Sequence, residues 1–267
     1  MNEVDLRVEV HNGVGLMVMN RPEKMNALSA DMNRMAQEAL REFAADPKVG
    51  AVVLTGEGRG FCGGGDVSAM HRGEEIGGKG ASLETKIDAL RQGQQFSWLL
   101  HSIPKVTIAA INGAAAGAGL GLALSCDLRY MSDRAKLTTA YARVGYGGDY
   151  GTTWGLTHLV GPARAKELFF LPDPIGADLA ERMGLVNGIF PSEQLLPEVM
   201  AVAERIARGP QVSYRYMKAN VNAAVTMDYR TMLDREAETH IRCGETEDHA
   251  EGVAAFMEKR EPSFKGR

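Results

Sequence analysis

The chain of 267 residues is 45% hydrophobic and 24% charged, which is sufficient for a substantial buried core. A formal net charge of −4 and an aromatic content of 6% provide neither the positive field nor the stacking surface typical of nucleic-acid binding. Three scattered cysteines suit neither a disulfide framework nor a zinc site, which favours a reducing, cytoplasmic location.

The N-terminal part of the chain predicts a hairpin followed by a helix. Residues 1–10 are charged and lack the apolar segment of a signal peptide. Two short strands are expected within residues 6–20, around the turn dipeptide Asn12-Gly13. Ser29 is expected to cap a helix that runs to about Ala45.

A buried strand is predicted over residues 51–54, and it leads into the glycine-rich segment GEGRGFCGGGDV. Asp66 lies at the end of that segment and is expected to begin the next helix. A further helix is predicted around residues 85–101. The charged segment over residues 72–86 between these helices has two interpretations, an ordinary solvated loop or, by resemblance to a loop of a known family, a mobile cover over a binding pocket.

The segment 106–126 is uncharged and about long enough to span a bilayer, and Gly113 and Gly117 have the GxxxG spacing. Its residues are mainly Ala and Gly rather than Leu and Phe, and Asn112 lies within it. We therefore expect a buried strand over residues 106–111, a tight turn and a buried helix, with no membrane partner.

A strand is predicted at residues 128–131. Beyond about residue 193 the pattern is helical, and Gly209-Pro210 separates the first two helices of this region. The predicted helices cover residues 194–208, 212–226, 229–243 and 247–258. We therefore predict an α/β core over residues 1–192 and a helical C-terminal region over residues 193–267.

Two glycine-rich turns each place small residues at the start of a predicted helix: the first turn, residues 61–66, and the second turn, residues 113–121. Helix N-termini expose N–H groups that have no partner within the helix. If the turns converge, their amides form an oxyanion hole; the alternative is that both serve only packing. Gly117, Gly119 and Gly121 have GxGxG spacing, which does not fit the GxGxxG pattern of dinucleotide binding.

Six segments are spread in order along nearly the whole chain, from residue 20 to residue 264: NRPEKMNALS, GRGFCGGGDV, INGAAAGAGLGLALSCD, LVGPARAKELFF, MGLVNGIFP and FMEKREPSF. Together they resemble the crotonase, or enoyl-CoA hydratase/isomerase, superfamily. The resemblance implies an α/β fold with a spiral of ββα units and a helical C-terminal trimerisation region. It implies an acyl-CoA substrate, with coenzyme A as part of the substrate rather than a permanently bound cofactor. We expect no metal, flavin or nicotinamide site.

The resemblance also implies roles for individual positions. The amides of Gly65 and Ala118 would stabilise the thioester oxygen, and Asp66 and Val67 would flank the acyl group. Residues implied to contact coenzyme A within the same subunit are Lys24, Met25 and Ala27 along the channel and the Gly63 carbonyl at the adenine.

Phe256 and Lys259 match C-terminal positions that reach the coenzyme A of a neighbouring subunit in the family. The resemblance therefore implies that the site is completed by a second copy of the chain. We expect a homotrimer, or a hexamer that is a dimer of trimers.

Typical hydratases in the family carry two glutamates, at positions that fall on Gly121 and Tyr141 here. A hydratase needs one group to activate water and another to protonate the α-carbon, so the loss of both carboxylates argues against hydration. Members that include enoyl-CoA and ring-epoxide isomerases use an acid at the position of Asp149. Since Asp149 is expected at the start of a helix, capping is its alternative role, and the helix N-terminus should favour its ionised form.

Tyr141 is expected in a half-buried strand, where it either donates a hydrogen bond to the acyl group or Asp149, or only packs. His101 is expected to be a structural histidine. The sequence favours an isomerase in which Asp149 moves a proton while the Gly65 and Ala118 amides hold the enolate. The alternatives are an enoyl-CoA hydratase with atypical catalytic groups and a non-catalytic acyl-CoA binder.

Overall fold

The computed structural model describes residues 4–72 and 76–267. Its larger sheet contains, in spatial order, β1 (Leu6–His11), β2 (Val14–Met19), β3 (Ala51–Gly56), β5 (Val106–Ile111), β7 (Leu128–Ser132) and β10 (Gly188–Phe190). β1 pairs with β2 in the antiparallel sense, and the other neighbours are parallel. The smaller sheet contains, in order, β4 (Gly60–Cys62), β6 (Ala114–Ala116), β8 (Lys136–Thr138) and β9 (Ile175–Gly176).

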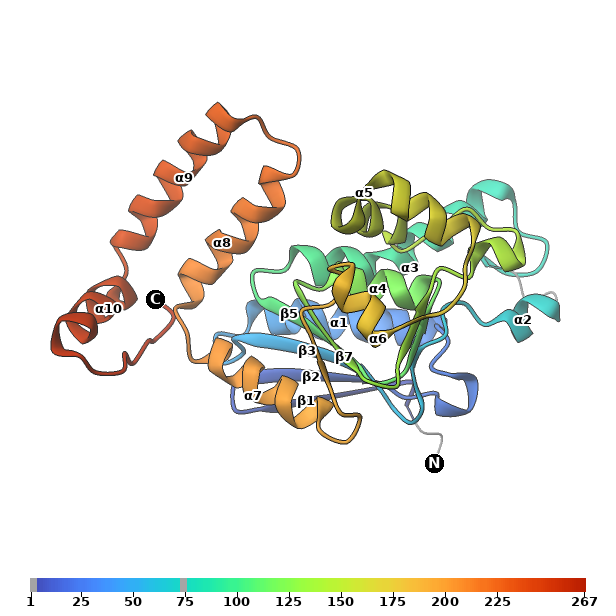
Figure 1. Cartoon of the computed structure of the whole chain (residues 1–267), viewed down its shortest axis with the longest axis horizontal. Helices are drawn as coiled ribbons and strands as arrows, with labels where there is room; N and C mark the ends of the chain where they lie inside the picture. The colour runs from blue at the N-terminus through green and yellow to red at the C-terminus, as the bar shows by residue number, and fades with distance from the viewer. Residues whose placement is uncertain (1–3, 73–75) are drawn as a thin grey trace.

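Helices cover both faces of the larger sheet (Figure 1). On one face lie α1 (Ala30–Ala45), α3 (Leu83–Ser102) and α4 (Ala118–Ser125), whose buried side chains share one core cluster. On the other face lies α7 (Leu195–Ala207), which packs on β3 and β5. All residues of β3 are buried, as expected for a parallel strand covered on both faces.

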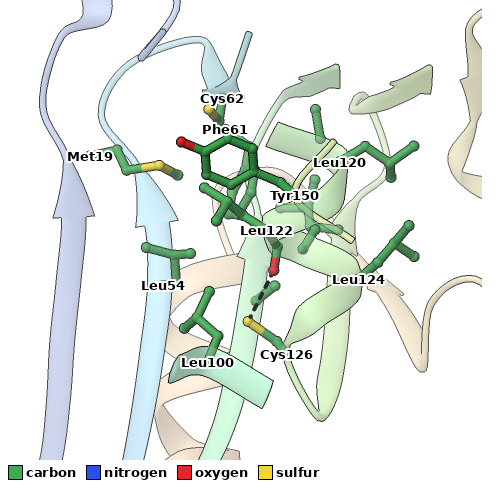
Figure 2. Close-up of a cluster of buried hydrophobic side chains, with 14 of the residues drawn as sticks. Met19, Leu54, Phe61, Cys62, Leu100, Leu120, Leu122, Leu124, Cys126 and Tyr150 are labelled. Carbon is green, nitrogen blue, oxygen red and sulfur yellow. Dashed lines mark hydrogen bonds between the residues drawn. The ribbon is translucent and has the colours of Figure 1, made fainter. Parts of the chain in front are cut away.

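The core beneath α4 explains why its segment is uncharged. Residues 118–124 of α4 are all buried, and Figure 2 shows Leu122 of this helix among core side chains that include Leu54, Leu100 and Tyr150. A helix that is apolar all round belongs in a protein interior. The predicted buried strand, tight turn and buried helix are therefore confirmed. Among the described residues, no helix combines the length and apolar character needed to cross a membrane.

Side-chain caps fix the starts of two helices next to the sheet. Ser29 accepts a hydrogen bond from the Met32 N–H at 3.0 Å, which confirms the predicted start of α1. α3 begins at Leu83, two residues before its predicted start, because Ser82 accepts from the Thr85 N–H at 3.1 Å. The hairpin formed by β1 and β2 is also as predicted.

The C-terminal helices project from this body (Figure 1); they are α8 (Gln211–Ala224), α9 (Tyr229–Gly244) and α10 (Glu247–Glu258). Lys218 of α8 ties them to the core, since its ammonium lies 2.8 Å from Asp127 Oδ2 and donates to the Leu100 carbonyl at 3.1 Å. All four predicted C-terminal helices are present. Because α7 packs on the sheet, the projecting part begins with α8, and a domain boundary at residue 192 stays a prediction.

Candidate active site

The two glycine-rich turns meet because the strands that precede them pair. β4 and β6 are parallel neighbours, so the chain leaves both strands at the same edge of the smaller sheet. Gly64 has φ +86°, and a Cβ built there would lie 2.7 Å from the Ala116 carbonyl oxygen and 3.3 Å from the Ala118 nitrogen. Only glycine allows so close an approach of two backbones. The predicted convergence of the turns is therefore confirmed.

The turns present backbone donors beside one another. Ala118 is the first residue of α4, where an α-helix leaves its N–H groups without an internal acceptor. In the described part of the chain, neither the Gly65 N–H nor the Ala118 N–H donates a hydrogen bond. Both amides are therefore available to an external acceptor, which is the requirement for an oxyanion hole.

The residues expected to contact coenzyme A gather at the first turn. The Gly63 N–H donates to the Met25 carbonyl at 2.8 Å, and the Lys24 ammonium lies 3.3 Å from Asp66 Oδ2. Lys24 ends the short helix η1 (Pro22–Lys24), and Ala27, which follows it closely, is buried. The structure thus brings these residues into one cluster around the turn.

Asp66 begins α2 (Val67–His71) as predicted. Its carboxylate accepts from the Ala69 N–H at 3.0 Å, and this bond, followed by the Lys24 contact, holds its pKa below the ordinary value. Val67, the first residue of α2, is 55% exposed. The end of the first turn therefore carries the ionised Asp66 carboxylate, held by its cap hydrogen bond, next to the exposed apolar side chain of Val67.

Phe256 and Lys259 lie away from this cluster. Both belong to the end of α10, which lies at the opposite end of the molecule from α2 (Figure 1). Phe256 is 83% exposed, and Lys259 ends the helix in the left-handed conformation. Within one chain the two residues cannot reach the turns, so any role at a site belongs to a second copy.

Asp149 and Tyr141, the two side chains predicted to act on the acyl group, lie together near the second turn. The Tyr141 hydroxyl donates to Asp149 Oδ1 at 2.7 Å and lies 2.9 Å from Thr152 Oγ1. Thr152 Oγ1 lies 3.4 Å from the carbonyl oxygen of Gly117, in the second turn. The carboxylate is thus linked by hydroxyl groups to the turn that holds Ala118.

The backbone around this pair is strained. Ala140, directly before Tyr141, has φ 58°, and Tyr150, directly after Asp149, has φ 48°. The left-handed region is rarely occupied by residues with a Cβ, and such conformations cluster at functional sites. The two positions bracket the segment that brings the phenol and the carboxylate together.

Three expectations about this pair are corrected. Tyr141 begins the short helix η2 (Tyr141–Val144) and is buried, rather than lying in a half-buried strand. The capping role for Asp149 is wrong, because α5 (Thr152–Phe170) is preceded by Gly151 and the Asp149 carboxylate accepts from Tyr141 instead. Burial raises the pKa of Asp149, against the expected ionising influence of the helix, and the hydrogen bond from Tyr141 partly opposes this rise.

Gly121, which the family resemblance matches to the first hydratase glutamate, has no free space for a side chain. A Cβ on Gly121 would lie 2.7 Å from both Thr152 Oγ1 and the Tyr150 carbonyl oxygen, and 3.0 Å from the Tyr150 Cβ. Real Cβ atoms essentially never show such contacts, so a larger side chain would displace the backbone beside Asp149. Thr152 and Tyr150 fill the space through which a glutamate would enter.

Burial also shifts the pKa of two groups outside the Asp149–Tyr141 pair. His101 packs edge-on against Trp154 with ring centroids 5.2 Å apart, and burial lowers its pKa. Burial raises the pKa of the Cys62 thiol to about 12, so at neutral pH it is protonated and a poor nucleophile. The expected loop over residues 72–86 includes residues 73–75, which lie outside the described residues.

Sequence reasoning missed Thr152, which no motif distinguishes from other threonines. Its hydroxyl matters because Tyr141 and Gly117 lie on either side of it, and that placement depends on the left-handed turn at Tyr150. The spacing of 11 residues between Tyr141 and Thr152 gives no signal of contact.

Comparison with known proteins identifies the family of the chain. Residues 9–267 match the family model described as enoyl-CoA hydratase/isomerase. The chain is 35% identical to a crotonyl-CoA hydratase of Syntrophomonas wolfei over 96% of each sequence. It is 33% identical to a 1,2-epoxyphenylacetyl-CoA isomerase of Escherichia coli over 97% of each sequence. The crystal structure of an enoyl-CoA hydratase from Bacillus anthracis superposes with a TM-score of 0.91 at 29% identity, covering 98% of this chain and 100% of that chain.

The chain therefore belongs to the enoyl-CoA hydratase/isomerase family. It is an enzyme of the crotonase family and has the crotonase fold, with a helical C-terminal region. The relatives carry both hydratase and isomerase names, with hydratase names the more common.

Proposed function

We propose that this enzyme is an enoyl-CoA isomerase that shifts a double bond in an acyl-CoA thioester. Asp149 removes a proton from the acyl chain, the Gly65 and Ala118 amides hold the enolate oxygen, and Asp149 returns the proton at another carbon. One base suffices for this shuttle, and removal and return by one carboxylate leaves no net change in protonation. Coenzyme A enters as part of the substrate and leaves with the product.

The observation that carries this proposal is the filled space at Gly121. Hydration requires two acid/base groups. Of the two positions that the resemblance matches to the hydratase glutamates, Gly121 has no room for a side chain, and the other is Tyr141, whose hydroxyl is hydrogen-bonded to Asp149. Among the described residues, Asp149 is the one carboxylate that is hydrogen-bonded to Tyr141, and through Tyr141 it is linked to Thr152 beside the second turn. A half-buried carboxylate with a raised pKa is suited to accept and return a proton.

Hydration with atypical groups is the second candidate, because relatives such as the crotonyl-CoA hydratase carry that name. A direct comparison separates the two activities. The enzyme is given 2-enoyl-CoA and 3-enoyl-CoA thioesters of increasing chain length in D₂O, and products are analysed by mass. We expect interconversion of the two alkenes with deuterium incorporation. Formation of 3-hydroxyacyl-CoA from crotonyl-CoA without alkene interconversion would contradict the proposal.

We also propose that the working enzyme is a homotrimer or hexamer. The C-terminal helices carry large exposed apolar side chains, which include Tyr229 at 81%, Met257 at 75% and Val221 at 68% exposure. Apolar surface of this extent on projecting helices marks an interface. A second copy seated there would bring its Phe256 and Lys259 toward the coenzyme A site of a neighbour.

A further inference from the structure

A row of hydrogen-bonding groups joins Asp149 to the second turn. From Asp149 Oδ1 the row passes to the Tyr141 hydroxyl at 2.7 Å, then to Thr152 Oγ1 at 2.9 Å, and ends at the Gly117 carbonyl at 3.4 Å. Thr152 is fully buried and Tyr141 is 5% exposed, so water competes little with these contacts. The proton positions along the row therefore depend on the groups themselves.

Each hydroxyl in the row has one proton, which decides the direction of its hydrogen bonds. An ionised Asp149 can only accept, so Tyr141 donates to the carboxylate and Thr152 is free to donate to the phenol oxygen of Tyr141. Both hydroxyl protons then point toward the negative charge. The Gly117 carbonyl meanwhile keeps the hydrogen bond from the Gly121 N–H at 3.1 Å.

A proton that Asp149 takes from a substrate and carries on Oδ1 reverses these directions. With the proton on Oδ1, the oxygen that faces the Tyr141 hydroxyl, Asp149 becomes a donor to the Tyr141 oxygen. The Tyr141 proton then turns to Thr152, and the Thr152 proton turns to the Gly117 carbonyl. Each hydroxyl keeps its own hydrogen and only rotates. The single proton that the row gains is the one that Asp149 takes from the substrate carbon, and the electron pair of that C–H bond remains in the enolate.

The far end of the row is the peptide group between Gly117 and Ala118. Its carbonyl is the acceptor for Thr152, and its N–H is the Ala118 donor assigned to the enolate oxygen. A hydrogen bond to a peptide carbonyl polarises the group, which makes its N–H a stronger donor. The rotation therefore strengthens the Ala118 donor in the state in which the enolate carries its charge.

We infer that Thr152 is a positioning residue that couples the protonation of Asp149 to the strength of the Ala118 oxyanion donor. This inference rests on the proposed function, since it requires Asp149 as the base and Ala118 as a donor. Thr152 touches neither substrate nor reacting atoms and acts through Tyr141 and Gly117. Its loss should lower the rate by about 3- to 10-fold, the scale of one net hydrogen bond.

The test compares Thr152→Val, which keeps the side-chain shape, with Thr152→Ser, which keeps the hydroxyl. Thr153→Val is the matched control, because Thr153 is the next residue of α5 and is exposed. We expect Thr152→Val to lower kcat about 3- to 10-fold with KM nearly unchanged, and to move the acid limb of the kcat/KM profile to higher pH. Thr152→Ser should recover most of the rate, and Thr153→Val should match the wild type.

A double-mutant cycle with Tyr141→Phe tests the coupling even if one variant is unstable. Because Thr152 acts through the Tyr141 hydroxyl, Thr152→Val should have little further effect in the Tyr141→Phe background. Independent effects of the two changes would overturn the inference, as would a Thr152→Val enzyme with wild-type kcat and pH profile. The activity of Asp149→Asn separates failure of this inference from failure of the proposed function. If only the inference fails, Asp149→Asn is still inactive; an active Asp149→Asn enzyme would overturn the proposed function as well.

Discussion

The Tyr141 hydroxyl and Asp149 Oδ1 lie 2.7 Å apart, although the chain between them forms a short helix and an exposed loop. The phenol is also stacked on Phe169, with ring centroids 5.8 Å apart, so its position is fixed by packing as well as by hydrogen bonding. Burial raises the pKa of the carboxyl group, and the phenol lowers it again. The pair thus sets the pH range in which Asp149 is ionised and able to act as a base.

Tyr141→Phe should move the acid limb of kcat/KM to higher pH. The wild-type limb itself should lie above the ordinary carboxyl pKa of about 3.9, since burial raises the pKa of Asp149. Removing the phenol donor takes away the group that lowers this pKa, so the rate is lost at a higher pH as the solution is acidified. Phe keeps the ring against Phe169, so the melting temperature serves as the control. A limb at the wild-type position would show that the phenol does not affect the base.

Gly121→Ala should destabilise the fold by about 1–3 kcal/mol, the usual cost of overpacking. The added methyl would lie 2.7 Å from the Tyr150 carbonyl oxygen and from Thr152 Oγ1. Gly244→Ala is the matched control, because it is also helical and a Cβ there meets nothing within 4 Å. Thermal unfolding should separate the two variants by several degrees. Gly121→Glu should not create crotonyl-CoA hydration, and a gain of that activity would contradict the account of this position.

Gly65→Pro should lower kcat by roughly 10²- to 10³-fold, because it removes one oxyanion donor. Gly65→Ala retains the N–H, and its methyl would meet only the Met70 Cε, at 2.7 Å, which is the movable end of a side chain. The Ala variant should therefore keep most of the activity. Circular dichroism on both variants checks folding. A folded Gly65→Pro enzyme with near-normal kcat would show that the Gly65 amide is not an oxyanion donor.

Sedimentation at micromolar concentration should find a trimer or a hexamer. The driving force is the apolar surface of the C-terminal helices, where Phe256 is 83% and Ile241 is 65% exposed. Ile241→Glu should weaken the assembly, while Glu238→Gln on the same helix should leave it unchanged. A monomeric wild-type enzyme with full activity would rule out a site completed by Phe256 and Lys259 of a neighbour.

The parts of the fold that the sequence predicts are those with strong local signals. Local patterns predict three of these parts: a run of β-forming residues at 51–54, a helix cap at Ser29, and the uncharged composition of segment 106–126. The strands β6, β8 and β9 have three residues or fewer and form through long-range pairing, so no local pattern indicates them.

At the site, the sequence predicts the glycine-rich turns directly, whereas it gives the contact between Tyr141 and Asp149 only as one of two alternatives. Ala140 and Tyr150 both adopt positive φ without being glycine or asparagine. Tertiary packing imposes these conformations, and they place Asp149 against Tyr141 instead of on the end of α5. The raised pKa of Asp149 follows from burial that no local sequence pattern indicates.

Asp149 is the base in the proposed reaction, and its replacement by asparagine tests that role. Asp149→Asn should retain affinity for acyl-CoA, because the residues gathered around the first turn are unchanged. Its melting temperature at pH 7 should be no lower than that of the wild type: a raised folded-state pKa means that the ionised carboxyl group costs stability above that pKa. Asp88→Asn, at an exposed site on α3, is the matched control.

The most direct measurement is the rate at which a bound 3-enoyl-CoA takes up deuterium from D₂O, measured for wild type, Asp149→Asn and Asp88→Asn at one pH. We predict uptake with isomerisation in the wild type and in Asp88→Asn. In Asp149→Asn both should fall together by at least the ~10²–10⁴-fold typical of a lost acid/base group, with ligand affinity preserved. Deuterium uptake at the wild-type rate in Asp149→Asn would contradict the account.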